Sequence, residues 1–264
     1  MNSNTYALKT TPIYAVSSGN GPTVICMHGI TGNAYVFEPI MRMLSDRFQV
    51  VSIDQRGHGR SGRPTGYRGE DFADDVAALV EQLGCGPAIL LGHSLGARNA
   101  LVAANRHPEL VRAVVALDFT PFIEKEVLDQ LAERVNGGNR SFESIEEIKA
   151  YLTQRYPLLP EDAINRRAHH GYHETEDGWR PLASPEAMQH TAEGLRDNLE
   201  DAVASIKHPA ILVRGAESKL VSEEAWRKTQ QLRPDLRYVV LAGSDHYIPE
   251  IKPAEVAELV SQVA

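Results

Sequence analysis

Short, continuous apolar runs alternate with helical patterns along most of this 264-residue chain. An unbroken apolar run is typical of a strand in a parallel sheet, because helices cover both faces of such a sheet. The runs that predict strands are residues 23–29, 48–54, 88–94, 112–118, 210–215 and 237–243. The helical patterns between them are residues 71–83, 95–107, 223–232 and 253–263. The alternation predicts an α/β fold with a mostly parallel sheet and helices on both faces, and residues 5–21 predict an antiparallel hairpin at one edge.

The alternation stops between Asp118 and about residue 205. This segment contains no strand-like run, and its amphipathic stretches predict helices. A long helical insertion between two sheet strands is expected to cover the edge of the sheet. We therefore expect a sheet core of residues 1–118 and 206–264, with residues 119–205 inserted as a helical cap.

The composition limits the possible partners and compartments. A net charge of −8 disfavours nucleic acid and anionic membranes as partners. No basic segment followed by an apolar run opens the sequence, and no apolar run has the length of a membrane span. The two cysteines, Cys26 and Cys85, form neither a disulfide framework nor a metal site. We expect a cytoplasmic protein with free thiols.

The strongest local signal is the pentapeptide GHSLG, Gly92 to Gly96. It follows an apolar run and opens a helical pattern, which is the context that gives the G-x-S-x-G motif its meaning. A nucleophilic serine must stand on a tight turn, and the glycines on either side let the strand and the helix approach closely. A chance strand–turn–helix with glycines is the alternative, and the flanking elements argue against it. Ser94 is therefore predicted to be a nucleophile.

Two further loops supply the groups that such a serine needs. The segment from His28 to Asn33 follows a predicted strand, so the backbone N–H groups of Ile30 and Leu95 are expected to bind an oxyanion. One such donor contributes about 3 kcal/mol of transition-state stabilisation. His246 follows the last strand and is the expected general base, because a histidine near the C-terminus fits this chain order. His28 is expected to order its loop by hydrogen bonding.

Other histidines are weaker candidates. His93 adjoins the serine, but its side chain must diverge from that of Ser94 at the turn. His169, His170 and His173 suggest a metal site, but no cysteine or carboxylate completes a ligand set at a useful spacing. We therefore expect neither a metal nor another cofactor.

The carboxylate partner of the histidine has two possible sources. In the loop after residues 210–215 the usual position of the acid holds Ser218, and Glu217 stands one residue too early. Asp118 ends the run at residues 112–118, at the sheet edge where catalytic groups gather in parallel sheets. Asp118 could instead cap the first helix of the insertion. We favour Asp118 as the acid, because it orients the imidazole without a shifted loop.

With these motifs the whole chain resembles the α/β-hydrolase superfamily. The segments HGIT, VFEPI, LSDRF, DQRGHG, GHSLGARN, ALDFTP and RGAESKLVS are more specific, and resemble bacterial amidases of vitamin B6 degradation. The resemblance implies a Ser94–Asp118–His246 triad and an oxyanion hole formed by Ile30 and Leu95. It also implies that the substrate is contacted by Arg134, Arg155, Tyr156 and Tyr247.

The cap arginines fit a dicarboxylate substrate, because a planar guanidinium binds a carboxylate through two hydrogen bonds. In an otherwise acidic protein the cap carries Arg134, Arg140, Arg155, Arg166, Arg167 and Arg180. Most of them are expected to pair with cap glutamates on helix surfaces. Arg134 and Arg155 stand at helix ends and could point toward the sheet edge.

The sequence thus predicts a serine hydrolase that cleaves the amide C–N bond of a small anionic N-acyl enamine dicarboxylate. The nearest alternative is a carboxylesterase acting on small esters. A cofactor-free dioxygenase or a lyase is another, because this scaffold hosts unrelated reactions, and a hydrolase-like ligand receptor is a third. The oligomeric state is left open, with a homodimer as one option.

Overall fold

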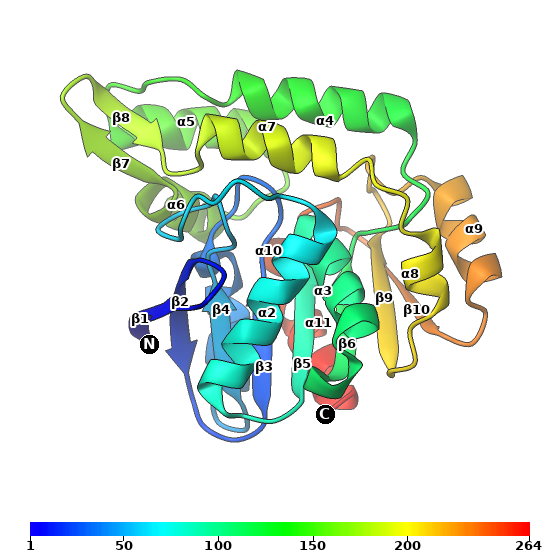
Figure 1. The fold of residues 1–264 in the computed structure, drawn as a ribbon. Coiled ribbons are helices and arrows are strands. Elements are labelled where there is room, and N and C mark those ends of the chain that lie inside the picture. Colours follow the sequence, from blue (N-terminus) through cyan, green and yellow to red (C-terminus); the bar gives the residue numbers. More distant parts are fainter.

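A computed structural model describes residues 1–264 and contains an eight-stranded sheet in the order β1-β2-β4-β3-β5-β6-β9-β10 (Figure 1). Strands from β4 to β10 in that order are parallel, and β1 and β2 add an antiparallel hairpin at one edge. The strand bounds are β1 Asn2–Ala7, β2 Pro12–Ser18, β3 Thr23–Met27, β4 Gln49–Ile53, β5 Ala88–His93, β6 Val111–Leu117, β9 Ala210–Gly215 and β10 Arg237–Leu241. The predicted fold class, strands and edge hairpin are confirmed.

Helices cover both faces of the sheet. The core helices are α1 Glu38–Leu44, α2 Gly69–Leu83, α3 Leu95–Arg106, α9 Glu223–Leu232, α10 Ile248–Ile251 and α11 Pro253–Gln262, with 3₁₀ turns η1 Ala34–Phe37 and η2 Pro108–Leu110. The predicted helices correspond to α2, α3, α9 and α11, whereas α1 and α10 lie where no helix is predicted. Figure 1 shows α2 and α3 in front of the sheet and α11 behind it.

The two faces bury separate hydrophobic clusters, which explains the unbroken apolar strands. Ile25 on β3 packs into the cluster that includes Leu79 of α2. Its neighbour Val24 faces the other way, into the cluster that includes Met41 of α1 and Val256 of α11. Because side chains alternate between faces along a strand, both sets of positions must be apolar.

Most residues between β6 and β9 form a layer over one end of the sheet (Figure 1). Its elements are α4 Lys125–Gly137, α5 Ile145–Arg155, α6 Glu161–His170, β7 Tyr172–Thr175, β8 Gly178–Pro181 and α7 Pro185–Gly194. The last helix before β9, α8 Glu200–Ala204, lies beside β9 and packs against α3 (Figure 1). The hairpin β7–β8 corrects the prediction that this segment has no strand. Its strands have four residues each and are polar, so they show no apolar run. The turn at Glu176 and Asp177, followed by Gly178 with φ +102°, is the local signal for it.

Both cysteines are free, with Cys26 buried in β3 and Cys85 half-buried. None of the helices combines the length and the apolar character needed to traverse a bilayer.

Candidate active site

Ser94 stands on a strained turn between β5 and α3. It has φ +53° and ψ −113°, a backbone conformation that non-glycine residues rarely adopt. The flanking glycines are sterically required. A Cβ atom at Gly92 would lie 2.2 Å from the carbonyl oxygen of Gly96, and one at Gly96 would lie 2.0 Å from that of Met27. The turn therefore presents the serine above the ends of β3 and β5.

His246 and Asp118 meet beside this turn, although they are 128 positions apart in the chain. His246 Nδ1 lies 2.7 Å from Asp118 Oδ2, and the carboxylate is completely buried. The ring of His246 also lies 4.7 Å, centroid to centroid, from that of His93, the residue before Ser94. Because Asp118 occupies Nδ1, the other ring nitrogen of His246 is available for proton transfer.

Asp118 is held by two further donors, one at the end of β9 and one in the loop after it. The N–H of Gly215 donates to Oδ1 at 3.0 Å, and the hydroxyl of Ser218 donates to Oδ2 at 2.5 Å. The neighbouring Glu217 is exposed and forms no hydrogen bond with His246, whose partner is Asp118. The serine at the usual position of the acid thus binds the acid that comes from β6, a contact that sequence reasoning missed.

Replacing Ser218 with alanine is expected to lower kcat/KM for amide hydrolysis by about 10-fold. The variant removes a hydrogen bond to a buried carboxylate, which is worth roughly 1.5 kcal/mol or more. Ser218→Thr is the matched control, because it keeps the hydroxyl. A steady-state comparison of the two variants, with their pH–rate profiles, separates a positioning effect from a loss of folding. Equal activity of Ser218→Ala and wild type would remove Ser218 from this role.

His93 anchors the loop that carries His246. Its Nε2 lies 2.7 Å from the backbone oxygen of His246. Nε2 therefore carries the proton and donates a hydrogen bond to that oxygen, and Nδ1 is unprotonated. Burial holds the pKa of His93 well below its usual value, which keeps the imidazole uncharged. The expected divergence of this side chain from Ser94 is consistent with that contact. The anchoring itself was not predicted, and the only signal for it is its place next to the serine.

The loop after β3 is ordered as expected by His28. Its Nδ1 lies 2.7 Å from the carbonyl oxygen of Gly29, and its Nε2 accepts the N–H of Gln55 at 3.0 Å. The imidazole is fully buried, and burial lowers its pKa well below the usual value. The backbone N–H groups of Ile30 and Leu95 donate no hydrogen bond within the protein. Two free N–H groups thus flank the serine turn.

A cavity of about 560 Å³ lies between this turn and the cap, and is called the main cavity here. From the sheet side it is lined by Gly29, Ile30, His93, Asp245, His246 and Tyr247. From the cap side it is lined by residues that include Arg134, Arg155, Tyr156 and Arg167. Of the predicted site residues, the cavity is lined by Ile30, Arg134, Arg155, Tyr156, His246 and Tyr247. Ser94 and Leu95 directly follow its lining residue His93, and Asp118 lies behind His246.

Arg134 and Arg155 contact no carboxylate. Arg134 Nη2 donates to the Tyr247 hydroxyl at 2.9 Å. Arg155 Nε donates to the Tyr156 hydroxyl at 3.1 Å, and its Nη2 donates to the backbone oxygen of Arg134 at 2.7 Å. Because phenols and a peptide oxygen leave both charges uncompensated, each guanidinium can still bind an anion.

Arg167 differs from these two, because it is paired. Its Nε donates to Glu250 Oε1 at 2.9 Å, and the Glu250 side chain, on α10, is completely buried. The expectation that most of the six cap arginines pair with cap acids is wrong. Only Arg140 with Glu147 and Arg166 with Asp162 do so. Arg167 pairs with an acid of the core, and Arg134, Arg155 and Arg180 form no ion pair.

The pKa values of Tyr156 and Tyr247 respond to burial and to the arginines on the cap side of the main cavity, which is called the arginine wall. Burial would raise the pKa of Tyr156, but Arg167, Arg155 and Arg134 outweigh it and lower that pKa. Burial raises the pKa of Tyr247, which lies on the sheet side. The arginines stack against both rings, with Arg167 Cζ 4.6 Å from the Tyr156 centroid and 4.9 Å from that of Tyr247. The wall is therefore suited to anions.

No group of three or more His, Cys, Asp or Glu side chains is arranged to hold a metal ion. The histidines of the HHGYH segment lie elsewhere. His170 stacks on Tyr35 at 3.6 Å, and His169 Nδ1 lies 2.7 Å from the Asn165 carbonyl oxygen.

Comparisons with known proteins agree with this geometry. The family profile of the α/β hydrolase fold matches residues 22–253. A 2-(acetamidomethylene)succinate hydrolase from Mesorhizobium japonicum is 54% identical over 236 residues, 89% of this chain and 85% of that protein. The crystal structure of an E-2-(acetamidomethylene)succinate hydrolase superposes with a TM-score of 0.97 at 49% identity, covering 99% of this chain and 98% of that one.

A more distant structure shows the same fold alone. The N-formylmaleamic acid deformylase of Pseudomonas putida S16 has a TM-score of 0.76 at 19% identity, with both chains fully covered. The profile match, the identity to a curated hydrolase and the serine turn above a parallel sheet agree. This chain belongs to the α/β-hydrolase family.

Proposed function

We propose that the protein hydrolyses the amide C–N bond of a small anionic N-acyl enamine dicarboxylate, such as 2-(acetamidomethylene)succinate. The observation that carries this proposal is the pair of uncompensated guanidinium groups, Arg134 and Arg155, facing a cavity beside Ser94 and His246. The 54% identity to a hydrolase of that substrate supports the same conclusion.

The charges of the wall match a dianion. On the cap side, Arg134, Arg155 and Arg167 bring three positive charges, and Glu250 cancels that of Arg167, which leaves two. The other charged residues of the lining, Glu217, Lys219 and Asp245, lie on the sheet side. Each free guanidinium can take one carboxylate through two parallel hydrogen bonds. Tyr156 and Tyr247 fix the two arginines and offer hydroxyls to the same ligand. The acyl group then points toward the serine turn.

In the first step, Ser94 Oγ attacks the acyl carbon while His246 takes its proton. The oxygen of the tetrahedral intermediate is held by the N–H groups of Ile30 and Leu95. Asp118 stabilises the imidazolium that forms and keeps its orientation. His246 then protonates the leaving nitrogen, and the C–N bond breaks to give an acyl-enzyme and the free enamine.

In the second step, a water molecule loses a proton to His246 and attacks the acyl-enzyme. The ester bond to Ser94 breaks, and the serine oxygen regains the proton. For an N-acetyl substrate the products are acetate and an enamine. These steps use side chains and backbone groups of this chain and no cofactor. The two free thiols support a cytoplasmic location for this reaction.

Replacing Arg155 with alanine tests the substrate class. We expect kcat/KM on N-acyl and N-formyl dicarboxylates to fall about 100-fold, because a charge-assisted hydrogen-bonded pair is worth roughly 1.5–3 kcal/mol. Neutral short-chain amides and esters should change little. Arg140→Ala is the matched control, because this cap arginine pairs with Glu147 and lines no part of the main cavity.

Two results would contradict the proposal. Strong turnover of neutral esters, with none of anionic amides, would make the protein a carboxylesterase. Equal losses on neutral and dianionic substrates in Arg155→Ala would show that the arginine supports the structure and not the recognition of the substrate.

A further inference from the structure

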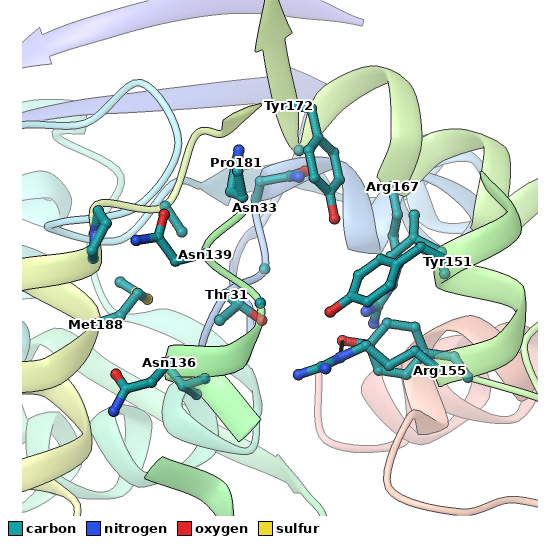
Figure 2. Close-up of a pocket in the computed structure, with 18 of the residues that line it drawn as sticks. Thr31, Asn33, Asn136, Asn139, Tyr151, Arg155, Arg167, Tyr172, Pro181 and Met188 are labelled. Carbon is teal, nitrogen blue, oxygen red and sulfur yellow. Dashed lines mark hydrogen bonds between the residues drawn. The ribbon is translucent and has the colours of Figure 1, made fainter. Parts of the chain in front are cut away.

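A second cavity, of about 210 Å³, lies between the cap and the loop after β3, and is called the cap cavity here (Figure 2). On the cap side it is bounded by the ends of α4, α5 and α6, by the β7–β8 hairpin, and by the start of α7. On the core side it is bounded by Thr31, Gly32, Asn33 and Val36. Ser94, Asp118 and His246 do not line it. It shares one wall with the main cavity, formed by Thr31, Gly32, Val36, Val135, Arg155, Tyr156 and Arg167. The cap cavity is therefore a neighbour of the reacting site.

The interior of the cap cavity has hydrogen-bonding groups without partners. The hydroxyl of Tyr151 is buried and makes no hydrogen bond. Figure 2 shows the Tyr151 and Tyr172 hydroxyls and the Arg155 guanidinium pointing into the same space, with Asn136 and Asn139 on the opposite side. A buried polar group left unsatisfied costs about 1–3 kcal/mol. A ligand that accepts these hydrogen bonds would recover that free energy.

The charges of the lining select an anion. No aspartate or glutamate lines the cap cavity, and its only charged residues are Arg155 and Arg167. Glu250 pairs with Arg167 from the other side, so Arg155 holds the unpaired charge. Hydroxyl donors beside a free guanidinium are the groups that a carboxylate prefers. One ordered water needs roughly 10–15 Å³, so the space admits a small organic acid.

We infer that the cap cavity is a second binding site for a small carboxylic acid, separate from the site of hydrolysis. The carboxylate lies between the Arg155 guanidinium and the hydroxyls of Tyr151 and Tyr172. Because Arg155 also faces the main cavity, the two sites compete for one cation, and a ligand in one weakens the binding of an anion in the other. The expected count of two sites rests on the dicarboxylate site proposed in the main cavity, whereas the site in the cap cavity is argued from its own lining.

Two neighbouring glycines provide a matched pair of variants. Gly138 lines the cap cavity in a helical conformation, φ −81° and ψ −12°, that any residue adopts. A Cβ atom there would lie 3.6 Å from the Tyr151 hydroxyl, so a longer side chain enters the space beside it. A Cβ atom at Gly137 would meet nothing within 4 Å. Gly138→Met is expected to fill the cavity, whereas Gly137→Met leaves it open.

Calorimetric titration with succinate counts the sites on the full chain without any turnover. We expect two equivalents for wild type and Gly137→Met, and one for Gly138→Met. Tyr151→Phe should weaken the second equivalent about 5-fold, the effect of losing one hydrogen bond of about 1 kcal/mol. Succinamide, the neutral analogue, should not bind at the second site. A succinate-soaked crystal would place the second ligand beside Arg155.

A single equivalent in wild type that persists in Gly138→Met would overturn the inference, and so would two equivalents in a Gly138→Met protein that melts like wild type. A single equivalent that disappears in Gly138→Met would instead contradict the dicarboxylate site proposed in the main cavity. If Gly138→Met does not fold, Tyr151→Phe combined with Tyr172→Phe decides the question. Unchanged affinity at the second site in that double variant also counts against the cap cavity. Loss of hydrolysis without loss of the second equivalent would affect only the proposed reaction.

Discussion

Replacing Ser94 with alanine is expected to lower kcat for the N-acyl enamine dicarboxylate by about a millionfold, the usual cost of removing a serine nucleophile. The N–H groups of Ile30 and Leu95 remain, and their free positions beside the turn leave a small residual rate. Steady-state hydrolysis at saturating substrate measures the effect. Ser94 already has φ +53° in wild type, so alanine meets the same backbone strain and the fold should persist.

The control for Ser94→Ala is the binding of succinate, because the variant leaves Arg134 and Arg155 unchanged. Succinate should bind to the main cavity of the variant as it does in wild type. Mass spectrometry supplies a second measurement, since a reactive acyl substrate should add one acyl group to wild type and none to Ser94→Ala. Hydrolysis at more than a few per cent of the wild-type rate in the variant would show that Ser94 is not the nucleophile.

Replacing Asp118 with asparagine should lower kcat by about 10⁴-fold. The amide keeps the shape of the carboxylate but loses its charge, and it can turn its NH₂ group toward His246 Nδ1. The imidazole then carries its proton on the nitrogen that must accept the proton of Ser94. It also loses a counter-ion that is 2.7 Å away and completely buried.

Glu217→Gln is the matched control for Asp118→Asn, because it removes the rival carboxylate in the same chemical way. Glu217 lines the main cavity, but it is exposed and forms no hydrogen bond with His246, so most of the activity should remain. Kinetics of both variants under the same conditions decide between the two acids. A large loss in Glu217→Gln with normal activity in Asp118→Asn would assign the acid to the loop after β9.

The positions of Ser94, Asp118 and His246 could be predicted because each follows a strand, and parallel strands end at the same edge of a sheet. The sequence could not show which groups hold them. The Ser218 hydroxyl reaches Asp118 across 100 positions, and His93 reaches the backbone of His246 across 153. Such contacts depend on how loops fold back over the sheet edge, which leaves no periodic pattern in the sequence.

The cap was predicted less completely than the sheet. Its helices have an amphipathic pattern, whereas the four-residue strands of β7 and β8 are too short and polar to show one. The partner of Arg167 could not be predicted from the sequence either. Glutamates of the cap are closer in sequence, yet the arginine pairs with Glu250, 83 positions away, because the cluster that contains α6 packs against Tyr247 and Ile251 at α10. Local charge patterns predict only local pairs.

The pair formed by Arg167 and Glu250 limits how this enzyme can be recombined with its relatives. A chimaera that carries the cap alone onto another hydrolase core would separate the two residues. Breaking a buried ion pair by removing one partner costs roughly 3–5 kcal/mol, a large part of the stability of a typical domain. Glu250 also lies four residues after His246. The smallest exchangeable unit is therefore the cap together with the segment that carries the catalytic histidine. The residues that recognise the substrate and the catalytic base would be exchanged together.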